Sequence, residues 1–147
     1  MRARISKTFK FEASHQLHNH DGKCRNLHGH SYKVEVIVYG HIRPADGSSK
    51  EGMVVDFNDI KAVWRDIEPQ LDHKHLNDSL QIVTTAENIA WWILSRFHAS
   101  GVAVNKVRVW ETATSMAEVD YAEVWANGND GALLNGPEVV KTETISG

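Results

Sequence analysis

Cysteine is nearly absent from this chain, which contains a single Cys24 in 147 residues. One thiol excludes an internal disulfide and fits a reducing compartment. No apolar run approaches the length that spans a membrane, and the first fifteen residues hold no apolar core of a signal peptide. These absences predict a cytoplasmic protein that does not associate with a membrane.

A surplus of positive charge is missing too. The formal net charge is −3, so no global basic field favours nucleic acid as a partner. Hydrophobic residues make up 41% and charged residues 24%, which is ordinary for a globular protein. With no internal repeat in sight, we predict one domain over residues 1–126 and a C-terminal extension over 127–147.

Histidine, by contrast, is abundant, with nine residues that concentrate between positions 15 and 30 and at 73 and 75. His28 and His30 stand at the start of a predicted strand and point to the same side of it, because they are two residues apart. His15 ends an earlier alternating segment, so pairing of the two strands brings three imidazoles together. Three imidazoles and an open fourth position are typical of a catalytic zinc site.

Cys24 lies four residues before His28, and its environment has three interpretations. Lys23 and Arg25 flank it, and nearby positive charge favours the reactive thiolate. A free cysteine is otherwise commonly an inert buried residue. It is also the obvious fourth ligand if the zinc site is structural and closed.

Carboxylates and a further histidine form the second group of candidates. In a polar loop, Asp72 and His73 are either surface residues or the proton partner of a thiol. Glu111 closes a strand whose valines share its face. It is therefore either a solvated strand end or a buried anchor for two adjacent N–H groups, such as those of an aminopyrimidinone ring.

Two further sets of side chains have a structural and a functional interpretation. Thr84 to Glu87 match a capping box. The sequence therefore favours a helix-capping role for Glu87 over a ligand-binding role. Four basic residues either meet a phosphate or form a solvated face: Lys10, Lys23, Arg25 and Lys33.

Hydrophobic periodicity predicts the element order ββααββ, an α+β fold. The expected strands span 2–15, about 30–39, about 104–111 and about 116–125, with a short extended piece at 53–55. One helix begins at the N-cap Asp56 and runs to about Gln70. Its predicted buried stripe is Phe57, Ile60, Trp64, Ile67 and Leu71. A polar loop at 72–78 precedes a second helix, which ends near Ser100 and Gly101 and points five residues inward: Ile89, Ala90, Ile93, Leu94 and Phe97. The tail is expected to hold one short strand at 139–145 or to be disordered.

Taken together, six short segments resemble the family of 6-pyruvoyl-tetrahydropterin and 6-carboxy-tetrahydropterin synthases. They are FEASH at 11–15, CRNLHGHS at 24–31, VDF at 55–57, LDHKHLND at 71–78, TAEN at 85–88 and VWET at 109–112. They occur in the family's order and span about residues 3 to 126. The tail beyond 126 resembles an addition to the family core.

The resemblance implies a fold, a metal and a set of residue roles. The fold would be a tunnelling (T-fold) subunit, an antiparallel sheet with two helices on one face, which assembles into an oligomeric barrel, typically a homohexamer, with active sites between subunits. The metal would be Zn²⁺, and the substrate a pterin triphosphate. The implied roles are zinc ligation by His15, His28 and His30, proton acceptance by Cys24, relay by His73 with Asp72, and pterin anchoring by Glu111, with Thr85 and Glu87 as further substrate-binding candidates.

The resemblance also implies a choice between two reactions of 7,8-dihydroneopterin triphosphate. The carboxy branch cleaves a carbon–carbon bond, releases acetaldehyde and triphosphate, and leads to 7-deazaguanine compounds such as queuosine. The pyruvoyl branch eliminates triphosphate and rearranges the side chain. The compact spacing Cys-x3-His-Gly-His resembles the carboxy branch more closely. A non-catalytic, zinc-stabilised pterin-binding oligomer is the alternative from another class.

Overall fold

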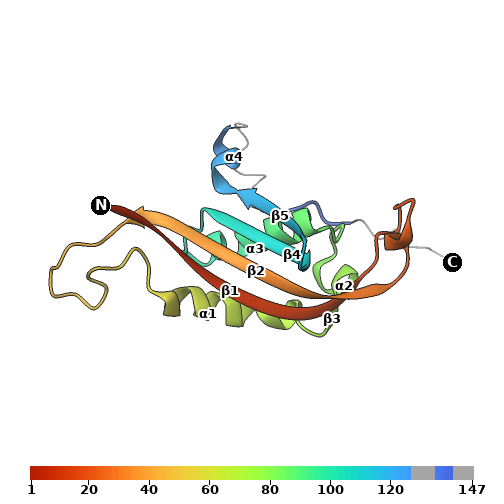
Figure 1. Cartoon of the computed structure of the whole chain (residues 1–147), viewed down its shortest axis with the longest axis horizontal. Helices are drawn as coiled ribbons and strands as arrows, with labels where there is room; N and C mark the ends of the chain where they lie inside the picture. Colours follow the sequence, from red (N-terminus) through yellow and green to blue (C-terminus); the bar gives the residue numbers. More distant parts are fainter. Residues whose placement is uncertain (127–134, 141–147) are drawn as a thin grey trace.

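The computed structural model describes residues 1–126 and 135–140, with the side chains of 124–126 left out. A five-stranded sheet in the order β3-β1-β2-β4-β5 carries helices on one face (Figure 1). Its strands are β1 (Arg2–His15), β2 (His28–His41), β3 (Lys74–His75), β4 (Lys106–Thr112) and β5 (Ser115–Asp120). The helices are α1 (Phe57–Ile67), α2 (Leu76–Leu80), α3 (Ala86–Ala99) and α4 (Tyr121–Ala126), with 3-10 helices at Lys23–Arg25 and Glu68–Gln70.

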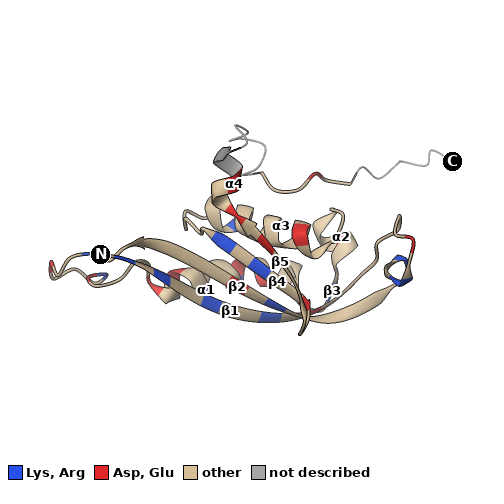
Figure 2. Ribbon diagram, turned by 45° about the horizontal axis from the view of Figure 1, so that its top comes forward, with Lys and Arg blue, Asp and Glu red and all other residues tan. Residues whose placement is uncertain are grey.

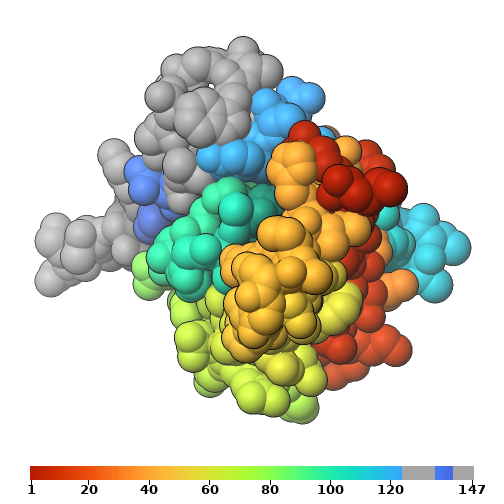
Figure 3. All heavy atoms as spheres, turned by 90° about the vertical axis from the view of Figure 1, so that its left-hand side faces the viewer, coloured from red at the N-terminus to blue at the C-terminus, as the bar shows by residue number. Residues whose placement is uncertain are grey.

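The long hairpin of β1 and β2 is the main element of the sheet. The two strands pair antiparallel over their whole length, and their register sets Ala13 opposite His30 and His15 opposite His28. Alternate side chains on each strand are buried under the helices, as a sheet with one covered face requires. The N-terminus and the connection 42–56 lie at one end of the hairpin (Figure 3), and the connection 16–27 lies at the other (Figure 1).

Helix α1 begins where the sequence predicts it. The side chain of Asp56 accepts a hydrogen bond of 2.8 Å from the backbone N–H of Asn58, which satisfies one of the free donors at the helix start. Four residues of the predicted stripe are buried. The prediction that Phe57 is buried is wrong, because this residue is 47% exposed. The first helical residue lies at the edge of the contact with the sheet, and Val63 fills the interior instead.

The predicted polar loop at 72–78 holds two short elements instead. Strand β3 pairs parallel with β1, with Ala13 opposite Lys74, and α2 follows directly. The polar side chains of residues 72–78 do not predict this strand pairing, because its hydrogen bonds are made by backbone groups. The pairing holds the segment against the histidine-bearing end of β1.

Helix α3 is capped one residue later than the sequence suggests. Thr85 is the N-cap and accepts a hydrogen bond of 3.2 Å from the N–H of Asn88, whereas Thr84 is buried. The predicted capping box with Glu87 is therefore wrong. The five residues expected on the inward side of this helix are all buried, and it ends at Ser100 and Gly101 as predicted.

Two further segments differ from the prediction. Residues 53–55 form no strand, and Val54 and Val55 lie in a bend. Strand β5 stops at Asp120 and does not continue to 125, because the Asp120 carboxylate accepts a hydrogen bond of 2.9 Å from the N–H of Ala122 and starts α4. No described helix has both the length and the apolar character needed to cross a membrane.

Part of the tail lies against α3. Gly136 and Pro137 are buried, and the N–H of Val140 donates a hydrogen bond of 2.7 Å to the carbonyl of Gln81. The predicted strand at 139–145 is not present at 139 and 140, and its remainder lies outside the described residues.

Charged residues recur along the strands of the sheet (Figure 2). Arg108 on β4 binds Glu35 on β2 and Glu118 on β5, at 2.9 Å and 2.7 Å. Lys33 lies over the ring of Trp110 on the same face. Charged side chains thus alternate with buried apolar ones along β2 and β4.

Candidate functional site

His15, His28 and His30 come together as the strand pairing predicts. Their nearest ring nitrogens, one from each residue, all lie within 4.8 Å of one another. The ring centroids are 4.5 to 5.1 Å apart. Among the described residues this triad is the one cluster of potential ligands of this kind.

Backbone carbonyls determine which nitrogens face the centre of the triad. Nδ1 of His15 lies 2.7 Å from the carbonyl oxygen of Thr84, and Nδ1 of His28 lies 2.7 Å from that of Asn26. Since a carbonyl only accepts, both Nδ1 atoms carry the proton, and both Nε2 atoms offer a lone pair. This is the outer-shell arrangement that orients histidine ligands of metals.

Burial favours the neutral form of two imidazoles of the triad, His15 and His30. Desolvation lowers the pKa of His15 to about 4, against the opposing effect of its hydrogen bond to the Thr84 carbonyl. The pKa of His30 is also lowered, first by burial and then by the charge of His28. The Nε2 atoms of His15 and His30 are buried without a partner among the described residues. Unprotonated, unpartnered nitrogens that converge on one point fit a divalent metal ion.

Cys24 does not belong to the triad. It lies in the 3-10 helix of the connection 16–27, is half-buried, and its carbonyl accepts a hydrogen bond of 2.8 Å from the N–H of Leu17. The described part of the chain adds no Cys, Asp or Glu to the three imidazoles. The geometry accordingly favours an open fourth position over a site closed by this thiol.

Glu111 stands at a β-bulge, where the register between β4 and β5 shifts. Bulges re-aim a side chain, and this carboxyl lines a cavity of about 200 Å³ together with Thr85, Glu87 and Leu17. Burial raises the pKa of Glu111, the neighbouring Glu87 carboxylate raises it further, and His28 lowers it. The three predicted substrate-binding residues therefore share one cavity close to the triad.

His73 and Asp72 form the expected pair, with Nδ1 2.9 Å from Oδ2. Asp72 also accepts a hydrogen bond from the N–H of Glu12, and the N–H of His73 donates to the carbonyl of Glu12. The hydrogen bond from Glu12 is the largest influence that lowers the pKa of Asp72. His73 adopts a left-handed backbone conformation, φ 58°, which is unusual for a residue with a side chain.

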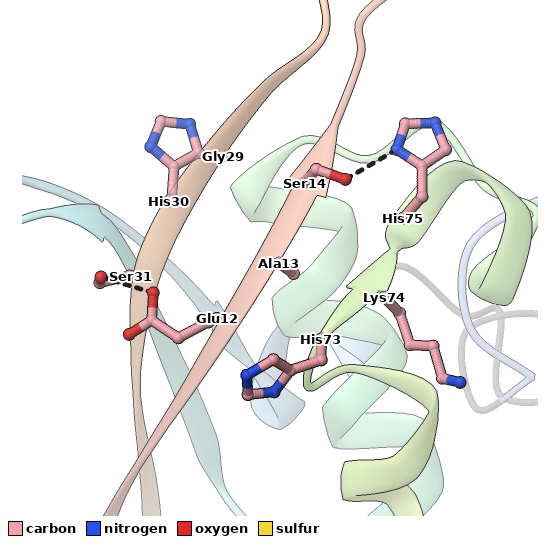
Figure 4. Close-up of a pocket in the computed structure, with 9 residues that line it drawn as sticks. All are labelled: Glu12, Ala13, Ser14, Gly29, His30, Ser31, His73, Lys74 and His75. Atoms are coloured by element: carbon pink, nitrogen blue, oxygen red, sulfur yellow. Dashed lines mark hydrogen bonds between the residues drawn. The ribbon is translucent and has the colours of Figure 1, made fainter.

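The ring of His73 is directed away from the core. It lines a second cavity together with Glu12, Ser14, Ser31 and the triad residue His30 (Figure 4). In the described residues no hydrogen bond or ion pair joins His73 or Cys24 to each other or to the triad. One chain therefore assembles the histidine triad and the carboxylate cavity, but not the predicted thiol–imidazole pair.

Two features of this region escaped the sequence reasoning. Ser14 and His75 form a hydrogen bond of 3.0 Å across β1 and β3, which no sequence spacing reveals (Figure 4). Tyr32 lies two residues after His30 on the same face, so its parity was visible, but its burial was not. The four basic residues considered for a phosphate are all exposed.

Comparisons with known proteins agree with this geometry. The family described as 6-pyruvoyl tetrahydropterin synthase matches residues 4–122. A Synechocystis protein named 6-carboxy-5,6,7,8-tetrahydropterin synthase is 46% identical over 116 residues, 77% of this chain and 89% of its own length. A Haemophilus influenzae protein of the same name is 36% identical over 139 residues, 78% of this chain and 96% of its own.

Solved structures share the fold. The 6-pyruvoyl tetrahydropterin synthase of Caenorhabditis elegans superposes with a TM-score of 0.71 at 25% identity, covering 82% of this chain and 96% of the other. The predicted α+β class, with helices on one face of the sheet, is thereby confirmed.

Proposed function

The chain belongs to the 6-pyruvoyl tetrahydropterin synthase family, and from that membership we propose that it is a 6-carboxy-5,6,7,8-tetrahydropterin synthase. The reaction converts 7,8-dihydroneopterin triphosphate to 6-carboxy-5,6,7,8-tetrahydropterin and releases acetaldehyde and triphosphate. The names of the two relatives at 46% and 36% identity support this branch. The spacing of Cys24, His28 and His30 supports it as well.

The converging Nε2 atoms beside a carboxylate cavity are the observation that carries the proposal. His15, His28 and His30 would hold Zn²⁺, which supplies Lewis acidity toward the oxygens of the substrate side chain. The open position of the triad and the Glu111 cavity lie on the same covered face of the sheet, so one ligand can occupy both.

The chain's own groups then bind the heterocycle and move protons. The Glu111 carboxylate accepts hydrogen bonds from adjacent N–H groups of the pterin ring, with Thr85 and Glu87 at the wall of the cavity. The Cys24 thiolate accepts a proton from the substrate side chain. His73, oriented by Asp72, exchanges that proton with the thiol.

The proposed proton transfer between Cys24 and His73 requires a homo-oligomer. Neither Cys24 nor any other residue of the connection 16–27 lines the cavity onto which His73 opens, so a second copy of the chain is the natural source of the thiol that it serves. We propose a hexamer with active sites between subunits, which sedimentation equilibrium tests directly.

Product mass analysis tests the reaction. Zinc-loaded protein is incubated with 7,8-dihydroneopterin triphosphate, and the proposal expects 6-carboxy-tetrahydropterin together with acetaldehyde. A 6-pyruvoyl product would keep the residue roles but move the protein to the other branch, the activity named for the C. elegans structure. Bound zinc and pterin without turnover would indicate a pterin-binding oligomer instead.

A further inference from the structure

The hydroxyl group of Tyr32 is buried without a partner. The residue is 1% exposed, and its oxygen makes no hydrogen bond within the described residues. A hydroxyl group that leaves water without gaining a hydrogen bond destabilises the folded chain. Packing alone does not require this atom, since the ring stacks on Phe11 with centroids 4.7 Å apart and planes 8° apart, a contact that phenylalanine would make equally well.

Tyr32 lies between the metal-binding triad and the carboxylate. It follows His30 on the covered face of β2, with ring centroids 5.4 Å apart, and its centroid lies 6.1 Å from that of His15. On the other side, Lys33 pairs with Trp110, which places Glu111 beside Tyr32 on the neighbouring strand. One polar atom without a partner therefore stands between the two groups that are proposed to hold the substrate.

The chemistry of the neighbours leaves one role vacant. An ionised Glu111 only accepts hydrogen bonds, and the Nε2 atoms of His15 and His28 carry no proton. A pterin presents ring nitrogens and oxygens that accept, besides the N–H groups that donate. The phenol of Tyr32 is a buried donor next to both groups that has no partner of its own among the described residues.

We propose that Tyr32 is a substrate-positioning residue, whose hydroxyl donates a hydrogen bond to an acceptor atom of the pterin ligand between Glu111 and the triad. This inference rests on the proposed function for the class of ligand. The hydroxyl gains a hydrogen-bond partner only when the ligand is bound. The unpaired hydroxyl therefore destabilises the free protein, and this destabilisation is removed in the complex.

The substitution Tyr32→Phe tests this directly, because it removes the oxygen and keeps the stacked ring. Binding of neopterin to zinc-free, full-length protein is measured by ligand fluorescence, and unfolding of the free protein by calorimetry. We expect the affinity for neopterin to fall about fivefold to tenfold, the loss of one hydrogen bond, with a higher unfolding temperature of the free protein. KM should rise by a similar factor while zinc content stays unchanged.

Tyr39→Phe is the matched control, since Tyr39 lies on the same strand but contacts Arg2 and Arg4 at the far end. It should leave neopterin binding unchanged. Unchanged neopterin affinity in Tyr32→Phe would overturn the inference, and so would a lower unfolding temperature, which would reveal a structural partner of the hydroxyl. Wild-type protein that binds no neopterin would instead refute the proposed function.

Discussion

The side chain of His15, the last residue of β1, donates a hydrogen bond of 2.7 Å to the carbonyl oxygen of Thr84, which directly precedes the cap of α3. The contact spans 69 positions of sequence and joins the sheet to the helix that forms the wall of the carboxylate cavity. It also directs Nε2 of His15 toward the other two imidazoles. Helix placement and the orientation of a candidate metal ligand thus depend on the same hydrogen bond.

Replacing one imidazole should abolish metal binding. His15→Ala removes a ligand, so its loss of zinc affinity should exceed the roughly 10- to 100-fold cost of outer-shell changes. His18→Ala is the control, because His18 is exposed in the adjoining connection and lies outside the triad. Zinc per chain, measured by mass spectrometry after dialysis, checks both variants. Full zinc content in His15→Ala would contradict the assignment.

Removing the thiol should separate chemistry from metal binding. Cys24→Ala should lower kcat by about 100- to 10,000-fold, the contribution typical of a positioned acid–base group. Zinc content and unfolding temperature should stay unchanged, since Cys24 is not among the clustered ligands. Loss of zinc together with turnover would indicate that the thiol is a ligand after all, and full turnover would refute its catalytic role.

His73 occupies a backbone conformation that glycine adopts more easily. The side chain is 80% exposed, so its pairing with Asp72 adds little to stability. His73→Gly should therefore change the free energy of unfolding by no more than about 1 kcal/mol, and in the stabilising direction. Turnover should fall as it does without the thiol. Chemical denaturation tests the expected change in stability, and steady-state kinetics test the expected fall in turnover. A large loss of stability would show that the imidazole is structural.

The raised pKa of Glu111 gives a pH dependence of definite sign. The folded chain holds this proton more tightly than the unfolded chain, so the contribution of Glu111 to stability is present at low pH and lost as pH rises through the raised pKa. Glu111→Gln removes that loss, and its unfolding temperature should exceed that of the wild type at pH 7.5 but match it near pH 4. Glu87 and His28 face the group and remain in both proteins.

Calorimetry of metal-free protein at the two pH values measures this difference for Glu111→Gln. The exposed Glu138→Gln is the control and should show no such pH-dependent gain. A constant offset between wild type and Glu111→Gln across the range would argue against a buried, proton-retaining carboxyl.

Docking of the tail depends on Gly136. A Cβ there would lie 2.9 Å from Oγ of Ser95, and φ is +85°. Gly136→Ala should cost about 1–2 kcal/mol for the backbone conformation alone, plus the clash. Gly101→Ala has a similar φ of +86° and an open surrounding, so it isolates the backbone part. Chemical denaturation compares them. A smaller cost at Gly136 than at Gly101 would show that the contact of residues 135–140 contributes little to stability.

By itself, the sequence determined the covered face of the hairpin, because a period of two puts His15, His28 and His30 on the same side as the apolar residues. It also determined the start of α1, since the capping side chain of Asp56 acts within its own turn. These features follow from local periodicity and local hydrogen bonds, which a single chain segment already contains.

The tertiary structure decided what depends on contacts between distant segments. The bulge that aims Glu111, the parallel pairing that holds His73 against Glu12, and the orphaned hydroxyl of Tyr32 all arise where strands meet. Backbone pairing and desolvation are properties of neighbouring segments, so no spacing within one segment encodes them. The sequence indicates which residue types form the site, but the tertiary structure determines how they are arranged.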